Sequence, residues 1–277
     1  MNQKKMISLV NKIRETKPLI HNITNIVVAN FTANGLLALG AKPVMASAPE
    51  EVNEITEISD ALVLNLGTFN KVYLESMKIA GKAANNKGIP IVLDPVGVGA
   101  SCFRTNSAQE LLQYLHIQFI RGNAAEVANL IGHKWEIKGV ETGNTDGDIV
   151  SLAILAAQKL KTTVIITGKN DIITDGNVVF QVQNGHPLLT KVTGAGCLLS
   201  AIVGAFAAVE KEPLEAAVSA LVFYGVAAEM AAVKTAALGP GSFQIELINQ
   251  LANLTGEQMD QYSLVLRREG DLSWVKQ

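Results

Sequence analysis

Short apolar runs rich in β-branched residues alternate with helical segments along the first 168 residues of the chain. The runs lie at residues 18–24, 42–47, 61–67, 89–97, 118–123 and 162–168, and amphipathic segments lie at 70–87, 107–116, 123–131 and 146–160. The runs are too uniformly apolar to have a solvent-facing side, as expected for parallel strands covered on both faces. The alternation therefore predicts an α/β fold around a mostly parallel central sheet, with helices on both faces.

After residue 168 the alternation of apolar runs and helical segments ends. The segment DIITDGNVVFQVQ (171–183) places Asp175 and Gly176 between two β-branched runs, which predicts a β-hairpin. Three helical stretches, starting near Gly194, Pro213 and Ser242, follow it. Because no linker, repeat or low-complexity tract divides the sequence, we expect a single domain over residues 1–277.

Composition narrows the class of function. The formal net charge is −2 and the chain has no long basic run, which argues against a nucleic-acid partner. The two cysteines, Cys102 and Cys197, and the four scattered histidines form neither a disulfide framework nor a metal-ligand pattern, as is usual in the reducing cytoplasm. The N-terminal residues predict an amphipathic first helix and not a signal peptide.

One uncharged stretch, residues 192–209, approaches the length of a membrane span. It begins with a glycine-rich turn, so we interpret it as a buried core helix. We therefore expect a soluble, cytoplasmic protein with no membrane partner.

Polar residues and glycines dominate the positions that directly follow the predicted strands. Ligands in parallel α/β sheets bind outside the carboxyl ends of the strands, so these positions predict a site. They are residues 22–25, Met45, Gly67, Asp94, 121–123 and 167–168.

The segment TKVTGAGCLLSAIVGAF (190–206) opens an apolar helix with two glycines. The amides of Gly194 and Gly196 could bind a phosphate, or the glycines could form a tight turn that lets the helix pack closely. Cys197 in the first turn is either a thiol with a lowered pKa or a small apolar filler. The chain has no GxxxxGK[ST] motif and no GxGxxG after a strand, which argues against a P-loop enzyme and a Rossmann dehydrogenase.

Three charged residues allow both structural and functional interpretations. Asp94 ends a buried strand, where a carboxylate needs a cation, a donor or a local turn hydrogen bond. Glu126 stands three residues after Asn123, which is the pattern of a capping box. Arg121 is either a phosphate clamp or a solvated residue at a strand end.

Six segments together resemble a known family. GAGC after the ITDG hairpin is similar to the GAGD signature of ribokinase-like kinases. With HNITNIVVANFTANGLLALGAKPVMA, LVLNLGT, LDPVGVGAS, RGNAAE and TVIITGK, it resembles the hydroxyethylthiazole kinase family over about residues 18–243. The resemblance implies a ribokinase-like fold and ATP-dependent phosphorylation of the primary hydroxyl of hydroxyethylthiazole in thiamine salvage. It also implies a homotrimer with pockets at the subunit interfaces.

The resemblance also implies roles for individual residues. Arg121 and Thr167 would bind ATP, and Asp94 and Glu126 would organise Mg²⁺. The substrate pocket would be lined by Asn25, Met45, Gly67 and Gly194.

Catalysis would involve Cys197 with the amides of Gly194 and Gly196. Cys197 stands where most ribokinase-like kinases have an aspartate base, so its role as a base stays open. Three alternatives also stay open: another small-alcohol kinase of this fold, a nucleotide-dependent NAD(P)H-hydrate dehydratase, and a binding protein without chemistry.

Overall fold

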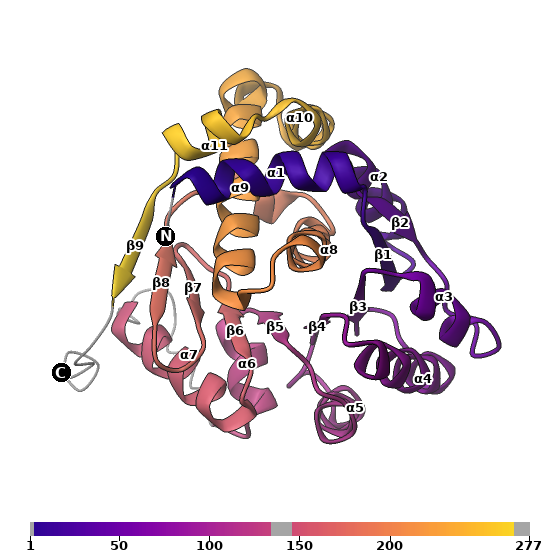
Figure 1. The fold of residues 1–277 in the computed structure, drawn as a ribbon. Coiled ribbons are helices and arrows are strands. Elements are labelled where there is room, and N and C mark those ends of the chain that lie inside the picture. Colours follow the sequence, from indigo (N-terminus) through magenta and orange to yellow (C-terminus); the bar gives the residue numbers. More distant parts are fainter. Residues whose placement is uncertain (1–2, 134–145, 269–277) are drawn as a thin grey trace.

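The computed structural model describes residues 3–133 and 146–268, and it contains one nine-stranded sheet with helices on both faces (Figure 1). The strand order is β2-β1-β3-β4-β5-β6-β7-β8-β9; β1 to β6 are parallel, and β7, β8 and β9 pair antiparallel. The strands are β1 (Leu19–Ile23), β2 (Lys42–Val44), β3 (Ala61–Asn65), β4 (Ile91–Asp94), β5 (Phe119–Gly122), β6 (Thr163–Ile166), β7 (Asp171–Thr174), β8 (Val179–Val182) and β9 (Val265–Arg268). All six apolar runs are strands, so the predicted α/β fold is confirmed.

The helices form a layer on each side of the sheet (Figure 1). One layer contains α1 (Gln3–Thr16), α2 (Ala29–Leu39), α8 (Ala195–Val209), α9 (Pro213–Thr235), α10 (Pro240–Asn253) and α11 (Gly256–Gln261). The other contains α3 (Val52–Ile58), α4 (Lys71–Lys87), α5 (Cys102–Tyr114), α6 (Ala124–Leu130) and α7 (Asp146–Leu160). Two short 3₁₀ helices complete the fold, η1 (Pro187–Lys191) and η2 (Ala236–Leu238). Each predicted helix is present, whereas α2, α3, α11 and β9 were not anticipated.

Alternating side chains of each strand pack on opposite helix layers. In β3, Leu62 and Leu64 join the core on the side of α4 and α5, and Val63 joins the core under α8. A Cβ atom on Gly204 of α8 would come within 2.9 Å of Val63 Cγ2, so α8 lies directly against the sheet. This close approach buries one face of the central strands, and α4 and α5 cover the other.

The predicted hairpin is confirmed. Strands β7 and β8 pair antiparallel, and Gly176 between them has a φ of 94°, in the left-handed region. The carboxylate of Asp175 accepts hydrogen bonds from the N–H groups of Asn177 and Val178 at 2.8 and 2.9 Å. Beyond the hairpin, β9 extends the sheet to its far edge (Figure 1).

The uncharged stretch at 192–209 contains α8, whose residues are mostly buried, so the prediction of a core helix is confirmed. Within the described residues, α8 is too short for a membrane span, whereas one helical run, Pro213–Leu238, has the length and hydropathy of such a span. In the fold, 83% of its most apolar window is buried. It is the core helix α9 with its 3₁₀ extension.

Candidate active site

The candidate site lies where the strands under α8 reach their carboxyl ends. Side chains two residues apart share a face of a strand, so the core positions under α8 predict which later residues lie on the same side. These core positions, one each on β3 to β6, are Val63, Val92, Phe119 and Ile165. Two residues further along are Asn65, Asp94, Arg121 and Thr167. The alternation of side-chain direction along each strand therefore places four polar side chains on the same side of the sheet, at one edge.

A chain of hydrogen bonds joins side chains from β3, β4, α8 and the loop after β1. Asn25 Nδ2 donates to Asn65 Oδ1 at 2.9 Å, and Asn65 Nδ2 donates to Asp94 Oδ2 at 2.9 Å. Ser200 Oγ of α8 donates to the same Asp94 oxygen at 2.8 Å. All four side chains are buried, so the chain forms a shielded polar network inside the edge of the sheet.

Asp94 is fully buried, and its two oxygens differ. Oδ2 accepts both hydrogen bonds, whereas Oδ1 has no hydrogen-bond partner among the described residues. Arg121 Nη1 lies 3.9 Å from Oδ1, beyond hydrogen-bond distance. Burial raises the pKa of Asp94 to about 6, against the opposing effects of Arg121 and the two donors. This unpartnered oxygen is available to a cation or a further donor.

Arg121 also contacts the end of β6. Its Nη2 donates to Thr167 Oγ1 at 2.7 Å, and its side chain is only 14% exposed. A Cβ atom on Gly196 would lie 2.6 Å from Arg121 Nη1, so the glycine leaves room for the guanidinium beside the start of α8. The sequence left open a solvated strand-end arginine, and the structure shows a mostly buried one.

The start of α8 is a backbone donor site. Gly194, the N-cap, has a φ of 87°, and no side chain caps the helix. A Cβ atom on Gly194 would also lie 2.5 Å from Val28 Cγ1. The first amides of an α-helix have no partner within the helix, so those of Gly196 and Cys197 can face an anion.

Cys197 is half-buried beside the polar network. Asn25 Nδ2 lies 3.5 Å from its Sγ. Burial, and next the charge of Asp94, raise the pKa of the thiol to about 11. The effect of the helix N-terminus is outweighed, so the structure favours a neutral thiol over an activated thiolate.

Glu126 forms the capping box that the sequence predicts. Its Oε2 accepts from the N–H of Asn123, and its own N–H donates to Asn123 Oδ1, both at 2.9 Å. Its Oε1 accepts from the N–H of Gly97 at 2.9 Å, which ties the loop after β4 to α6. The charge of Glu126 also contributes to the raised pKa of Asp94, so the two carboxylates are close enough to interact electrostatically.

Gly67 and Asn25 are neighbours. The N–H of Gly67 donates to Asn65 Oδ1 at 2.9 Å, and a Cβ atom on Gly67 would lie 2.6 Å from Asn25 Nδ2. Met45 is half-buried and directly follows β2, the edge strand beside β1. The structure therefore joins Asn25 and Gly67 to the network and places Met45 to one side of it.

Four residues near this edge were not singled out from the sequence. Asn65 and Ser200 hold Asp94, as described above. Arg104 of α5 donates to the carbonyls of Leu66, Gly67 and Val96, and thereby joins the loops after β3 and β4. Asp171 accepts from the N–H of Gly168 at 3.0 Å, and burial raises its pKa to about 6. Asn65 could have been found by the strand-end rule, since it directly precedes Leu66 and Gly67 at the end of an apolar strand.

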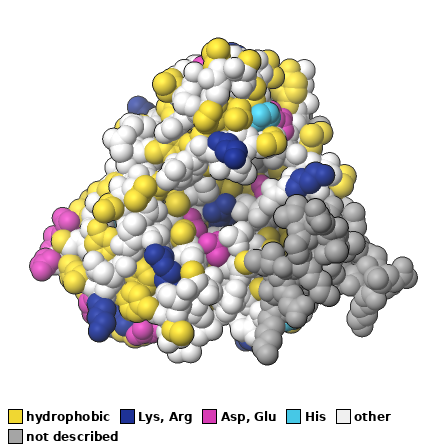
Figure 2. Space-filling model, turned by 180° about the vertical axis from the view of Figure 1, so that it is seen from behind, with side chains coloured by type: hydrophobic (Ala, Val, Ile, Leu, Met, Phe, Trp, Pro, Cys, Tyr) yellow, Lys and Arg dark blue, Asp and Glu magenta, His cyan; other side chains and the backbone are white. Residues whose placement is uncertain are grey.

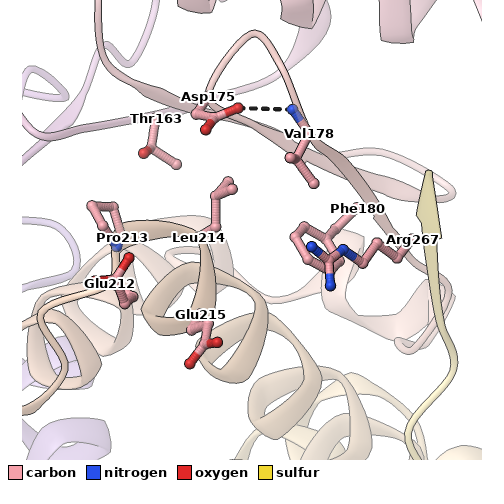
Figure 3. Close-up of a pocket in the computed structure, with 9 residues that line it drawn as sticks. All are labelled: Thr163, Asp175, Val178, Phe180, Glu212, Pro213, Leu214, Glu215 and Arg267. Atoms are coloured by element: carbon pink, nitrogen blue, oxygen red, sulfur yellow. Dashed lines mark hydrogen bonds between the residues drawn. The ribbon is translucent and has the colours of Figure 1, made fainter. Parts of the chain in front are cut away.

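A separate cavity of about 260 Å³ lies between the hairpin and the start of α9 (Figure 3). It is lined by Thr163, which begins β6, and so it lies at the opposite end of that strand from Thr167. Its wall includes Phe180, whose ring lies 5.6 Å from the Arg267 guanidinium carbon. None of the site residues predicted from the sequence lines it.

Comparison with known proteins identifies the family and agrees with the fold. Residues 10–257 match the model of the hydroxyethylthiazole kinase family. The chain is 44% identical to a hydroxyethylthiazole kinase protein from Pyrococcus horikoshii OT3, over 96% of this chain and all of that one, with a TM-score of 0.87.

Two more distant structures share the fold alone. A ribokinase-like superfamily protein from Enterococcus faecalis V583 is 12% identical over 92% of this chain and 96% of its own, with a TM-score of 0.65. Pyridoxal kinase from Staphylococcus aureus, in complex with ADP, is 19% identical over 75% of this chain and 86% of its own, with a TM-score of 0.59. The family match and the 44% identity show that this chain belongs to the hydroxyethylthiazole kinase family and is a kinase of ribokinase-like fold.

Proposed function

We propose that this kinase transfers the γ-phosphoryl group of ATP to the primary hydroxyl of hydroxyethylthiazole. The observation that carries the proposal is the continuity of the polar network. It runs from Asn25 through Asn65 to Asp94 without a break, beside the first turn of α8. An acceptor alcohol at one end and a phosphate at the other would be neighbours, which phosphoryl transfer requires.

The proposed roles follow this geometry. The alcohol binds against Asn25 and Gly67, with Met45 and Gly194 completing its pocket. The nucleotide binds to Arg121 and Thr167, which already form a hydrogen bond with each other.

The residues present fit a magnesium ion. Mg²⁺ typically keeps several waters and binds one or two carboxylates together with phosphate oxygens, so it needs no larger set of protein ligands. Asp94 offers a buried oxygen without a hydrogen-bond partner, and Glu126 lies close enough to affect its pKa. We propose that these two carboxylates hold Mg²⁺, which when bound would neutralise charge on the phosphates.

Catalysis then rests on positioning and on donors to the transferred group. The amides at Gly194, Gly196 and Cys197 are placed to donate to it as charge develops. In a loose transition state the acceptor hydroxyl loses its proton only late in the transfer, so a strong base is not essential. The thiol of Cys197 is neutral and cannot take this proton, so Cys197 acts as a neighbouring contact and the proton passes to an oxygen of the transferred phosphoryl group.

We also propose a cytoplasmic homotrimer in which a neighbouring subunit completes the pocket. Both cysteines are free, as is usual in the reducing cytoplasm. Ile26 and Val27, directly after Asn25, are 74% and 66% exposed, and other apolar side chains are exposed elsewhere (Figure 2). Light scattering is expected to give three times the 29.5 kDa chain mass, and a mass of one chain would overturn the shared pocket. The one sheet that joins all described strands also supports a single domain over residues 1–277.

A coupled ADP-release assay with and without hydroxyethylthiazole tests the reaction. We expect ADP release that depends on both the alcohol and Mg²⁺. Release only with a different alcohol would identify another small-alcohol kinase. Conversion of hydrated NAD(P)H would identify the dehydratase, and ligand binding without turnover would identify a binding protein.

A further inference from the structure

Asn65 occupies the centre of the polar network. It is the last residue of β3, it is 1% exposed, and it pairs in the parallel register with Asp94. Because paired residues on neighbouring strands share a face, the two side chains lie next to each other under α8. The backbone register, and not a flexible loop, therefore fixes the contact between Asn65 and Asp94.

Both ends of the Asn65 amide are committed. Oδ1 accepts from Asn25 Nδ2 and from the N–H of Gly67, each at 2.9 Å, and Nδ2 donates to Asp94 Oδ2 at 2.9 Å. A flipped amide would face Nδ2 toward two donors and Oδ1 toward a carboxylate. The partners thus allow one orientation of the side chain.

The network also orients Asp94. Asn65 and Ser200 donate to the same oxygen, Oδ2, one from the sheet and one from α8. Oδ1 is then the oxygen that faces Arg121 and has no hydrogen-bond partner among the described residues. Without these two donors, nothing in the described network would distinguish the two oxygens.

We propose that Asn65 is a positioning residue that holds the alcohol-binding side of the site in register with Asp94 on the phosphate side, while Ser200 fixes the carboxylate only. This inference rests on the proposed function. Asn65 acts through Asn25, Gly67 and Asp94 and need not touch either substrate. Asn65 and Ser200 therefore differ in a measurable way. Loss of Asn65 affects both the alcohol-binding side and the phosphate side of the site, whereas loss of Ser200 affects only the phosphate side.

The test compares three variants with the parent protein. Asn65→Leu removes both the acceptor toward Asn25 and Gly67 and the donor toward Asp94, with nearly the same side-chain volume. Ser200→Ala removes one donor to Asp94 with a small change in size. The matched control is Asn184→Leu, because Asn184 is also a buried asparagine (6% exposed) with several hydrogen bonds, but those bonds reach Glu229, Tyr262 and Leu264.

Three quantities are measured for each protein. They are the kcat of thiazole phosphorylation, the Kd of hydroxyethylthiazole by calorimetry without nucleotide or metal, and the Kd of metal-free ADP. For Asn65→Leu we expect kcat to fall about 100-fold and the alcohol to bind about tenfold more weakly. Ser200→Ala should lower kcat about tenfold with an alcohol Kd within about twofold of the parent. ADP affinity should stay within about threefold in both, since Arg121 and Thr167 are untouched.

Asn65→Asp separates the two ends of the amide and covers the case in which Asn65→Leu does not fold. It keeps an acceptor toward Asn25 and Gly67 and puts a second carboxyl beside Asp94. The two carboxyls can share a proton near neutral pH but repel each other when both are ionised, so at pH 9 we expect an unchanged alcohol Kd and a kcat at least tenfold lower than the parent at the same pH. Parent-like values for Asn65→Leu, or equal losses in Asn65→Leu and Asn184→Leu, would overturn the proposal. So would an alcohol Kd weakened as much by Ser200→Ala as by Asn65→Leu. Failure of the proposed function would appear instead in the parent protein, as no alcohol-dependent ADP release.

Discussion

Replacing Asp94 with asparagine should make the protein more stable while it loses activity. In the folded protein the pKa of Asp94 is raised from 3.8 to about 6, chiefly by burial. Between about pH 4 and 6 the folded state holds a proton that the unfolded state has released. Stability therefore falls as the pH rises through this window, and the full cost of the buried charge is present above it.

The magnitude follows from the size of the shift. About two pKa units, at roughly 1.36 kcal/mol each, correspond to about 3 kcal/mol at pH 8. Asparagine resembles the protonated carboxyl and can still accept hydrogen bonds from Asn65 and Ser200. We expect Asp94→Asn to raise the free energy of unfolding by about 3 kcal/mol at pH 8, and by only about 1 kcal/mol at pH 4.5. Its kcat should fall by at least about 100-fold, because the charge that acts on the phosphate side is lost.

Urea unfolding followed by circular dichroism at the two pH values measures the gain, and the ADP-release assay measures turnover. The control is Asp175→Asn in the exposed hairpin turn, where an amide oxygen can still accept from Asn177 and Val178. It should change stability by less than about 0.5 kcal/mol at pH 8. A gain in Asp94→Asn that is equal at both pH values, or a loss of stability at pH 8, would refute the reasoning.

Substitutions at three further positions test the site. Glu126→Gln should fold, but its free energy of unfolding should fall by about 1 kcal/mol, because one amide oxygen cannot accept from both Gly97 and Asn123. Its Mg²⁺-dependent kcat should also fall. Lower thermal stability with full turnover would leave Glu126 as a helix cap only. Cys197→Ala should lower kcat by about tenfold. Cys197→Asp should keep or raise kcat in single-turnover assays, since a carboxyl ionises at a much lower pH than a thiol in the same surroundings. A parent-like Ala variant with a dead Asp variant would make 197 a packing position. Gly196→Ala should weaken ATP binding in calorimetry, because the new Cβ displaces the guanidinium at the end of the Arg121 side chain. The change in stability should be small, because the backbone of the helix is unaffected. Unchanged ATP affinity would place the guanidinium outside the nucleotide site.

Features that depend on near neighbours in the sequence could be predicted. The six parallel strands were identifiable because short apolar runs indicate burial, although β2 at the sheet edge is partly exposed while the other five are almost wholly buried. The hairpin at Asp175 and the capping box at Glu126 were also identifiable, because their hydrogen bonds close within three residues. Asp94, Arg121 and Thr167 could be placed at one edge because parallel strands end there together.

The tertiary structure alone decided the partners and charge states of the site. Ser200 is 106 residues from Asp94, and Asn25 is 172 residues from Cys197, so no local pattern links either pair. The helix N-terminus at Cys197 favours a thiolate, yet burial and the charge of Asp94 raise the thiol pKa to about 11. The strand-end glycines and polar residues thus predicted the edge of the sheet at which the candidate site lies. Which oxygen of Asp94 is free, and which groups are charged, depends on packing between distant segments, because desolvation is a property of the assembled core.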